Sequence, residues 1–419
     1  MACMAAVGAR RGGSSRSLAA IYPWLAAMAA VGLTSSPLDE PALWYQVCHY
    51  AWPVAAIAAV AIVARADDRT ARRAMWAALA GAFALQLATV AAIPSPVIDV
   101  WTLTQGAVHS LLRGVHPYTA RVADVYHGTF EGGYVSSVYP YMPATLLAHA
   151  PSVALFGDYR IGLALCLPAT VAFVRGAGRR LHVDPRALDV MTLVLVLHPR
   201  SAFIVGSGYN EPLLTLAAAI FVYAAARAPD GTAASIAFWM MPAMKQYFVA
   251  PALMRLLSTL DDSWKRRATM FGTLVAAATV APFLIWGPTA TLDGILFQVR
   301  PSIGFRPDSL SASAALAWAT GWIVPWWTPL AAQLVAGAVA FAWLRRCGLG
   351  GFLLASALAL FASFLFGRQA FLNYYAVVSA MLLLAALVFA ERSVEPSPES
   401  APIEPPRKHE NTKKIGLVS

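Results

Sequence analysis

The residue with the clearest potential for chemistry is Asp99. It follows an apolar segment that ends in two prolines, Pro94 and Pro96, and it heads a run in which apolar residues recur at helical three- and four-residue steps. A carboxylate at such a position can act as a general base, taking the proton of an attacking hydroxyl group. The structural alternative is an N-cap, in which the same carboxylate accepts backbone N–H bonds at the start of a helix.

The loop that contains Asp99, residues 94–141, is rich in histidine and tyrosine. These side chains are suited to stacking on sugar rings and to hydrogen bonding with sugar hydroxyl groups. Tyrosine also gathers at bilayer interfaces, so part of this enrichment requires no ligand. We expect His116, Tyr118, Tyr139 and Tyr141 to bind a sugar or its acceptor.

Basic residues that could neutralise a phosphate leaving group are the counterpart of this carboxylate. Lys245 lies inside the apolar segment 232–257, and an unpaired ammonium group costs at least about 2.5 kcal/mol at mid-bilayer. Lys245 is therefore expected to be functional, unless its side chain simply snorkels to the interface. Arg300 precedes the turn PSIGFRP and Arg306 lies within it, and we expect them to bind either a phosphate or lipid headgroups. Because these cations supply the positive charge, we expect neither a metal nor another cofactor.

A further group of polar residues lies in the stretch 198–214, HPRSAFIVGSGYNEPLL. Asn210 and Glu211 stand at the end of one apolar segment, just before the next apolar helix. Glu211 caps that helix, orients Lys245 or binds acceptor hydroxyl groups, and the sequence leaves these three roles open. Arg200 belongs to the same predicted outer mouth.

The composition places these residues in a membrane protein. Of the 419 residues, 59% are hydrophobic and 12% are charged, about half the charged fraction of an ordinary soluble domain. The mean hydropathy is +0.60. These values exclude a single large soluble enzyme, and the lack of alternating short strands excludes a membrane barrel. The net charge of +10 is attributed to membrane topology, and the four cysteines show no spacing typical of a disulfide framework or a zinc site.

The apolar runs predict an all-α polytopic bundle of about 10–13 membrane helices, with amphipathic helices on its outer face. One amphipathic helix is expected to run from Asp99 to Arg113, and residues 311–322 are expected to lie on the same surface. We expect residues 142–156 to be re-entrant or interfacial and residues 232–257 to form a hairpin of two short helices. The apolar segments run approximately over 18–33, 43–64, 74–93, 142–156, 159–174, 187–205, 212–228, 232–257, 268–287, 326–344, 350–366 and 372–390.

The basic residues predict how the chain is oriented. Residues 1–17 are expected to be cytoplasmic, residues 18–390 to form the transmembrane domain, and residues 391–419 to form a disordered cytoplasmic tail. A cleavable signal peptide ending near Ala29 is the alternative for the first segment. In this topology most of the 31 Lys and Arg residues are cytoplasmic, as in multi-pass proteins of a plasma or inner membrane. Loops 94–141 and 288–325 are then on the outer side.

Five stretches of the chain, in this order, resemble the GT-C superfamily of integral-membrane glycosyltransferases, and more narrowly its family 87 mannosyltransferase-like proteins. They are DVWT at 99–102, LLRGVHPY at 111–118, YPYMPATLLAHAPSVALFGDYR at 139–160, GYNEPLL at 208–214 and MKQYFVAPAL at 244–253. The resemblance covers approximately residues 75–390. It implies Asp99 as the base and Lys245, with Arg300 or Arg306, as the phosphate-binding group. The GYNEP element departs from the pattern of many relatives, which leaves the acceptor open.

The expected function is transfer of a hexose or pentose, with mannose as the first candidate, from a polyprenyl-phosphate sugar donor. The acceptor is a glycolipid or glycan of the cell envelope on the outer face, and the other partners are membrane lipids and not nucleic acid. A lipid-borne donor agrees with the absence of a P-loop and of a dinucleotide fingerprint from the sequence. The alternative is a transporter or lipid flippase for cell-envelope precursors, which would place ionisable groups near the midplane. A non-catalytic partner of envelope enzymes is a third possibility.

Overall fold

The computed structural model describes residues 43–122, 125, 138–198, 200–258, 263–297, 306 and 308–391. These residues form helices and connections with no β-strand, as the sequence predicts. The predicted segment 18–33, the cytoplasmic residues 1–17 and the tail from residue 392 lie outside them. In chain order the α-helices and short 3₁₀-helices (η) are α4 (Leu43–Arg65), α5 (Asp68–Ala92), α6 (Asp99–Leu112), η2 (Pro117–Thr119), α7 (Pro143–Phe156), α8 (Tyr159–Arg180), α9 (Pro185–Val196), α10 (Ser201–Gly206), α11 (Glu211–Ala225), α12 (Thr232–Met244), η3 (Gln246–Phe248), α13 (Val249–Leu257), α14 (Ser263–Trp286), α15 (Pro288–Ile295), α16 (Ala312–Thr320), α17 (Thr328–Leu344), η5 (Arg345–Cys347), α18 (Gly348–Leu365) and α19 (Leu372–Phe389).

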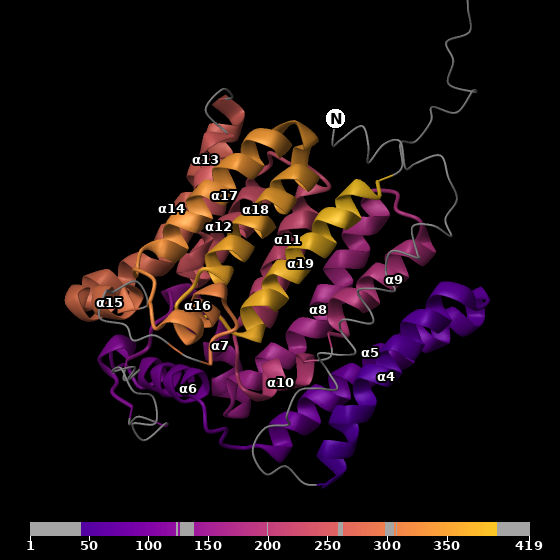
Figure 1. The fold of residues 1–419 in the computed structure, drawn as a ribbon, viewed down its shortest axis with the longest axis horizontal. Helices are drawn as coiled ribbons and strands as arrows, with labels where there is room; N and C mark the ends of the chain where they lie inside the picture. Colours follow the sequence, from indigo (N-terminus) through magenta and orange to yellow (C-terminus); the bar gives the residue numbers. More distant parts are fainter. Residues whose placement is uncertain are drawn as a thin grey trace, which may run out of the picture.

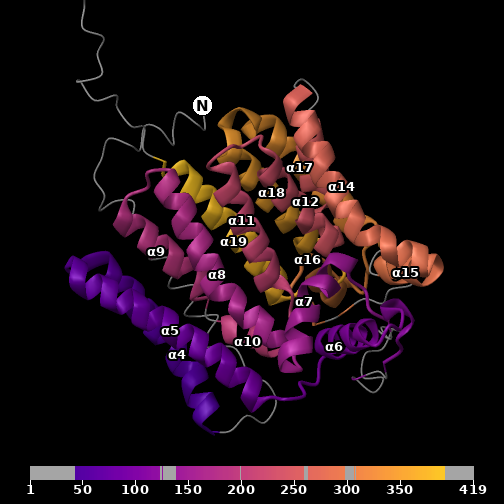
Figure 2. The same ribbon diagram turned by 180° about the vertical axis from the view of Figure 1, so that it is seen from behind.

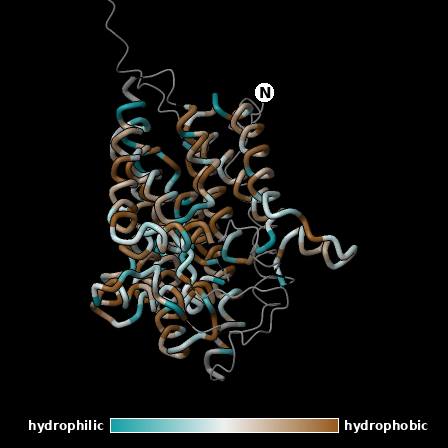
Figure 3. The backbone as a smooth tube through the Cα atoms, turned by 90° about the vertical axis from the view of Figure 1, so that its left-hand side faces the viewer, coloured by the Kyte–Doolittle hydropathy of each residue, from teal (hydrophilic) through white to brown (hydrophobic). Residues whose placement is uncertain are grey.

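Five helical stretches of the described chain are long and apolar enough to cross a membrane. They comprise α5, α8, most of α14, α19 and the stretch Thr328–Leu365, which turns at η5 into the hairpin of α17 and α18. Hydrophobic residues run along most of the bundle, whereas hydrophilic segments gather near helix ends (Figure 3). Large apolar side chains also face outward, including Ile285 and Trp343, which are 84% and 81% exposed. Such a surface is stable in lipid and not in water, which indicates a membrane-embedded protein.

The helices are arranged as a bundle with two different ends (Figures 1 and 2). The body contains α8, α9, α11, α12, α14, α17, α18 and α19, and the hairpin of α4 and α5 packs along one side. Helices α6, α7, α10 and α16 gather at one end, which we call the site end. At the opposite, basic end, Arg186 on α9 pairs with Asp68 on α5 at 2.8 Å, and Arg255 pairs with Asp230 at 3.8 Å. The first pair links the α4–α5 and α8–α9 connections, and the second links the α11–α12 connection to α13. The arginine clusters beside these connections lie at one end of the bundle, as a topology with a basic cytoplasmic side requires.

Two apolar segments are interrupted, and both interruptions lie at the site end. Segment 232–257 is the predicted hairpin of α12 and α13, with Lys245 and η3 forming its turn. Segment 187–205 is divided, because α9 ends at Val196 and α10 begins at Ser201. A proline follows His198 in the sequence, and the residue before a proline is disfavoured in helical conformation.

Helix α7 begins and ends near the same face of the bundle, as expected for a re-entrant or interfacial segment. Near its start, the Thr145 hydroxyl group donates to the carbonyl of Met244 at 2.8 Å, at the turn of the α12–α13 hairpin. At its far end, the Gln105 side chain of α6 donates to the carbonyl of Gly157 at 2.6 Å. Because α6 lies across the site end, α7 does not traverse the bundle.

Candidate functional site

Asp99 lies at the start of the helix that crosses the site end. It is the first residue of α6, and extended Ile98 occupies the N-cap position that the sequence offered as an alternative for Asp99. The Asp99 Oδ1 atom accepts the N–H of Val100 at 2.7 Å. A carboxylate in the first turn is also stabilised by the positive end of the helix dipole. The backbone therefore holds this side chain in a defined orientation.

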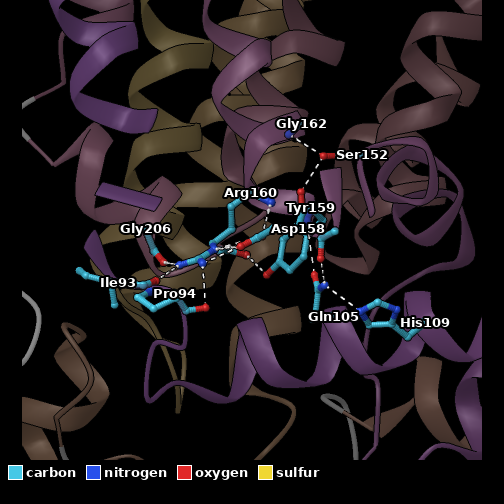
Figure 4. A network of polar contacts seen from close by, with 12 residues as sticks. Ile93, Pro94, Gln105, His109, Ser152, Asp158, Tyr159, Arg160, Gly162 and Gly206 are labelled. Atoms are coloured by element: carbon cyan, nitrogen blue, oxygen red, sulfur yellow. Dashed lines mark hydrogen bonds and ion pairs between the residues drawn. The ribbon is translucent and has the colours of Figure 1, made fainter. Parts of the chain in front are cut away.

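A fully buried arginine fixes the entry to α6 (Figure 4). The Arg160 guanidinium group donates to the Asp158 carboxylate, with Nε and Nη2 at 2.9 and 2.6 Å from Oδ2. Its Nη1 donates to the carbonyls of Ile93 and Gly206, both at 2.8 Å. The same group lies 5.3 Å from the centre of the Trp101 ring on α6. Arg160 thus ties the ends of α5 and α10 to α8, and it positions the two segments that lead to Asp99 and Glu211.

Tyr159, the neighbour of Arg160, positions the glycine of the GYNEP stretch. Its hydroxyl group donates to the carbonyl of Gly208 at 2.7 Å, and its backbone N–H donates to the Gln105 side chain at 3.3 Å. Gly208 has a φ of +73°, and a Cβ atom there would lie 2.1 Å from the Tyr159 oxygen. Only glycine fits this close approach and this left-handed backbone. The contact sets the path of the chain toward Asn210 and Glu211.

Lys245 and Glu211 form a buried ion pair. Lys245 Nζ lies 3.6 Å from Glu211 Oε1, and the two side chains are only 2% and 1% exposed. The ammonium group also lies 3.9 Å from the centre of the Tyr141 ring, with the rings of Tyr247 and Tyr374 at 5.6 and 5.8 Å. Carboxylate and aromatic faces together stabilise a charge inside an apolar segment. Of the three roles considered for Glu211, this geometry supports the one in which Glu211 orients Lys245.

Asp99 and Tyr141 line one open cavity, which we call the Asp99 cavity. Its volume is about 1170 Å³, counting the space open to solvent. Lys245 lies in the wall behind Tyr141 and interacts electrostatically with Asp99, although it is not itself a lining residue. The charged and polar lining residues are Asp99, Tyr141, Arg200, Tyr209, Arg306, Asp308, Gln369, Asn373 and Tyr374.

Arg306 is oriented by contacts at the rim of this cavity. Its Nε and Nη2 atoms each donate to the Asp308 carboxylate at 2.8 Å, and its guanidinium group lies 5.0 Å from the Phe371 ring centre. The backbone N–H of Arg306 also donates to the carbonyl of Arg368 at 3.2 Å. Arg300, the other arginine predicted to bind phosphate, lies outside the described residues.

Three of the predicted sugar-binding residues are packed behind the cavity and do not line it. Tyr118 and Tyr139 are each 1% exposed, and their rings meet edge to face at 5.5 Å. His116 Nε2 lies 3.3 Å from both the Phe283 carbonyl and the Thr291 hydroxyl group. Burial raises the pKa of both tyrosines, so their hydroxyl groups stay protonated. The structure gives these residues packing contacts, whereas Tyr141 lines the cavity. Contact of any of them with a sugar stays a prediction.

The packed aromatic residues nevertheless determine where Tyr141 lies. The Tyr118 hydroxyl group donates to the Tyr141 carbonyl at 2.6 Å, and the Tyr139 and Tyr141 rings are 5.4 Å apart. Tyr118 and Tyr139 therefore influence the shape of the cavity by fixing the position of Tyr141. Asn210 has a comparable supporting position, because its Oδ1 atom lies 2.7 Å from His149 Nε2 within the protein.

The cavity also contains residues that the sequence does not indicate as candidates, namely Tyr209, Asp308, Asn373 and Tyr374. For Arg200 the sequence indicates only a general outer mouth. The sequence signal for Asn373 and Tyr374 is that both are polar residues in the first turn of an apolar helix. That signal is weak, because helix ends are commonly polar whether or not they bind a ligand.

This arrangement can combine proton abstraction with neutralisation of an anion. Asp99 supplies a carboxylate, while Arg200 and Arg306 supply positive charge around the same space. Among the described residues, no group of three His, Cys, Asp or Glu side chains has the arrangement of a metal site.

No protein-family model, no curated protein and no solved structure matches the chain.

Proposed function

We propose that the chain is an integral-membrane glycosyltransferase with a GT-C-like bundle. In this proposal it transfers a hexose or pentose, with mannose as the first candidate, from a polyprenyl-phosphate carrier to a cell-envelope glycolipid or glycan. The site end faces outward, and both termini are cytoplasmic. The observation that carries the proposal is the shared cavity of Asp99, Arg200 and Arg306, with Lys245 behind its Tyr141 wall.

The proposed reaction assigns a role to each group in this cavity. Asp99 accepts the proton of the acceptor hydroxyl group while the oxygen forms a bond to the anomeric carbon of the sugar. The bond from that carbon to the phosphate oxygen breaks, with inversion, and the electron pair leaves with the phosphate. Arg306, held by Asp308, and Arg200 neutralise the departing anion. Lys245 acts through Tyr141, as a positioning residue with a fixed positive charge.

Transfer by the purified full-length protein tests this proposal. The protein is placed in nanodiscs with radiolabelled polyprenyl-phosphate mannose, or the corresponding arabinose, glucose and galactose donors, and with an envelope extract as acceptor. Asp99→Asn is expected to lower transfer about 100-fold or more, because removal of a general base typically costs this much. Asp68→Asn, the same chemical change at the basic end, is the matched control and is expected to match wild type. Equal transfer by a folded Asp99→Asn protein would remove Asp99 from the mechanism.

Transport of an envelope precursor is the second candidate function. The buried pair of Lys245 and Glu211 favours it, because transporters carry ionisable groups inside their bundles. Movement of a fluorescent polyprenyl-phosphate lipid between leaflets of proteoliposomes measures this activity directly. Movement without sugar transfer would support transport and contradict the glycosyltransferase proposal.

A further inference from the structure

A second cavity lies between helices of the bundle and is separate from the Asp99 cavity. Its volume is about 660 Å³, counting the space open to the surroundings, and it shares no lining residue with the Asp99 cavity. Its walls come from α8, α9, α11 and α19 of the body, together with α5 of the lateral hairpin and α10 of the site end, which pack against them (Figures 1 and 2). Aliphatic side chains such as Leu163, Leu167, Val194 and Leu383 form most of these walls. We call it the Gln86 cavity.

Two buried lining residues of the Gln86 cavity carry hydrogen-bond acceptors without donors. Gln86 is 4% exposed and Glu211 is 1% exposed. Among the described residues, no donor bonds to Gln86 Oε1 or to either carboxylate oxygen of Glu211. Lys245 Nζ, at 3.6 Å from Glu211 Oε1, is beyond hydrogen-bond distance. A buried acceptor without a donor is unfavourable, so these atoms favour a ligand that donates hydrogen bonds.

The charge of the lining indicates which ligand fits. Glu211 is the one formally charged residue among the described residues that line this cavity. Its carboxylate accepts hydrogen bonds and cannot donate them. The described lining contains no lysine or arginine, and Lys245 already pairs with Glu211, so a phosphate or sulfate group in the cavity would have no cation of its own. A neutral group that donates a hydrogen bond has no such penalty.

His198, in the connection between α9 and α10, adds a neutral polar group to the same lining. Its Nδ1 atom accepts the N–H of Arg200 at 3.1 Å, which leaves the proton of the neutral ring on Nε2. Because Nδ1 accepts this bond, the ring is neutral, and its Nε2–H group can donate to an oxygen atom of a ligand.

We propose that the Gln86 cavity binds an uncharged lipid alcohol, that is, an aliphatic chain that ends in a hydroxyl group. The chain lies along Leu163, Leu167, Val194 and Leu383, and the hydroxyl group donates to Glu211 or Gln86. The hydroxyl proton occupies an acceptor that otherwise has none, and the chain replaces empty apolar space. This binding does not require sugar transfer, so it is independent of the proposed reaction in the Asp99 cavity.

Photo-crosslinking of the full-length protein in nanodiscs tests the proposal. One probe is a long-chain alcohol with a diazirine group in the chain, and the other is the same chain ending in a sulfate. The alcohol is expected to label peptides of α8, α9 and α19 at cavity residues at least about tenfold more than the sulfate, because the described lining offers the sulfate no unpaired cation. Glu211→Gln is expected to reduce this ratio, because the amide does not repel the sulfate and Lys245 loses its carboxylate partner.

A second pair of variants keeps the test independent of Glu211. Ser379→Phe places a large side chain in the cavity and is expected to lower labelling by the alcohol severalfold. Leu382→Phe makes a similar change on the exposed side of the same helix and is expected to leave labelling unchanged. Equal labelling by both probes in wild type would overturn the proposal, as would undiminished labelling of Ser379→Phe or labelling confined to outward-facing residues.

Discussion

At the scale of single residues, Lys245 shows how this chain holds a charge inside an apolar segment. Its ammonium group has the Glu211 carboxylate on one side and the Tyr141 ring at 3.9 Å on another. Removing a cation from water is unfavourable, and the anion and the aromatic face offset part of that cost. Snorkelling to the interface, the other interpretation of this lysine, does not describe a side chain that is 2% exposed.

Replacing Lys245 with methionine is expected to destabilise the protein strongly. The substitution leaves Glu211 as an unpaired buried carboxylate, and breaking a buried pair in this way typically costs about 3–5 kcal/mol. Thermal unfolding in detergent measures the effect as a lower Tm. The double variant Lys245→Met/Glu211→Gln is expected to recover much of the loss, because it removes the uncompensated charge.

Arg266→Met is the control for this prediction. It removes an exposed cation at the basic end of the bundle and is expected to leave Tm close to that of wild type. If Lys245→Met unfolds at the same temperature as Arg266→Met, the buried ion pair does not stabilise the folded chain.

At the scale of helices, the site depends on short connections and not on the long spans. Arg160 bonds the carbonyls that end α5 and α10, and these are the residues just before the segments that carry Asp99 and Glu211. A buried arginine with five N–H donors can satisfy several helix-end carbonyls at once, which no apolar residue can do. The relative position of α6 and α11 therefore follows from one side chain of α8.

Gly208→Ala is expected to disturb this arrangement more than an equivalent substitution elsewhere. The φ of +73° disfavours alanine, and the new Cβ atom would also collide with the Tyr159 oxygen. We expect a loss of about 3 kcal/mol or more in the free energy of unfolding, from the strained backbone and the overpacked contact together. Thermal or denaturant unfolding of the purified variant measures this loss.

Gly114→Ala separates the two causes. Gly114 has a nearly equal φ of +71°, but no atom lies within 4 Å of the position that the alanine methyl group would occupy. This variant is expected to lose only about 1 kcal/mol, the cost of the backbone conformation alone. Similar losses for the two variants would show that Tyr159 adjusts freely and does not fix the loop.

At the scale of the whole molecule, the two ends of the bundle differ in charge. The connections between α4 and α5 and between α8 and α9 carry arginine clusters, whereas Asp99 and the residues around it lie at the opposite end. In a membrane such an asymmetry predicts that the basic end lies in the cytoplasm. We therefore expect the proposed site to face outward.

Cysteine labelling in intact cells tests this orientation. In a chain whose four native cysteines are replaced by serine, Val115→Cys at the site end is expected to react with an impermeant maleimide. Ala228→Cys, in the exposed turn after α11, is expected to react only after the membrane is permeabilised. The reverse pattern would place the Asp99 cavity in the cytoplasm and contradict an outer-face transfer reaction.

The sequence by itself determined the helical elements and most of their bounds. Hydrophobic runs and helical periodicity are local properties, so α6, the hairpin of α12 and α13 and the spans α8 and α19 were predictable. Asp99, Lys245, Glu211 and Arg306 were also recognisable, because a charge in or beside an apolar segment stands out in composition.

Only the tertiary structure decided which of these residues meet. It paired Lys245 with Glu211, brought Arg306 into the cavity of Asp99, and buried His116, Tyr118 and Tyr139 behind it. Such contacts join segments far apart in the chain, and they depend on how helices pack and where connections bend. Tyrosines in a loop look alike in sequence whether they face a ligand or the protein interior, because local composition carries no information about the direction of a side chain.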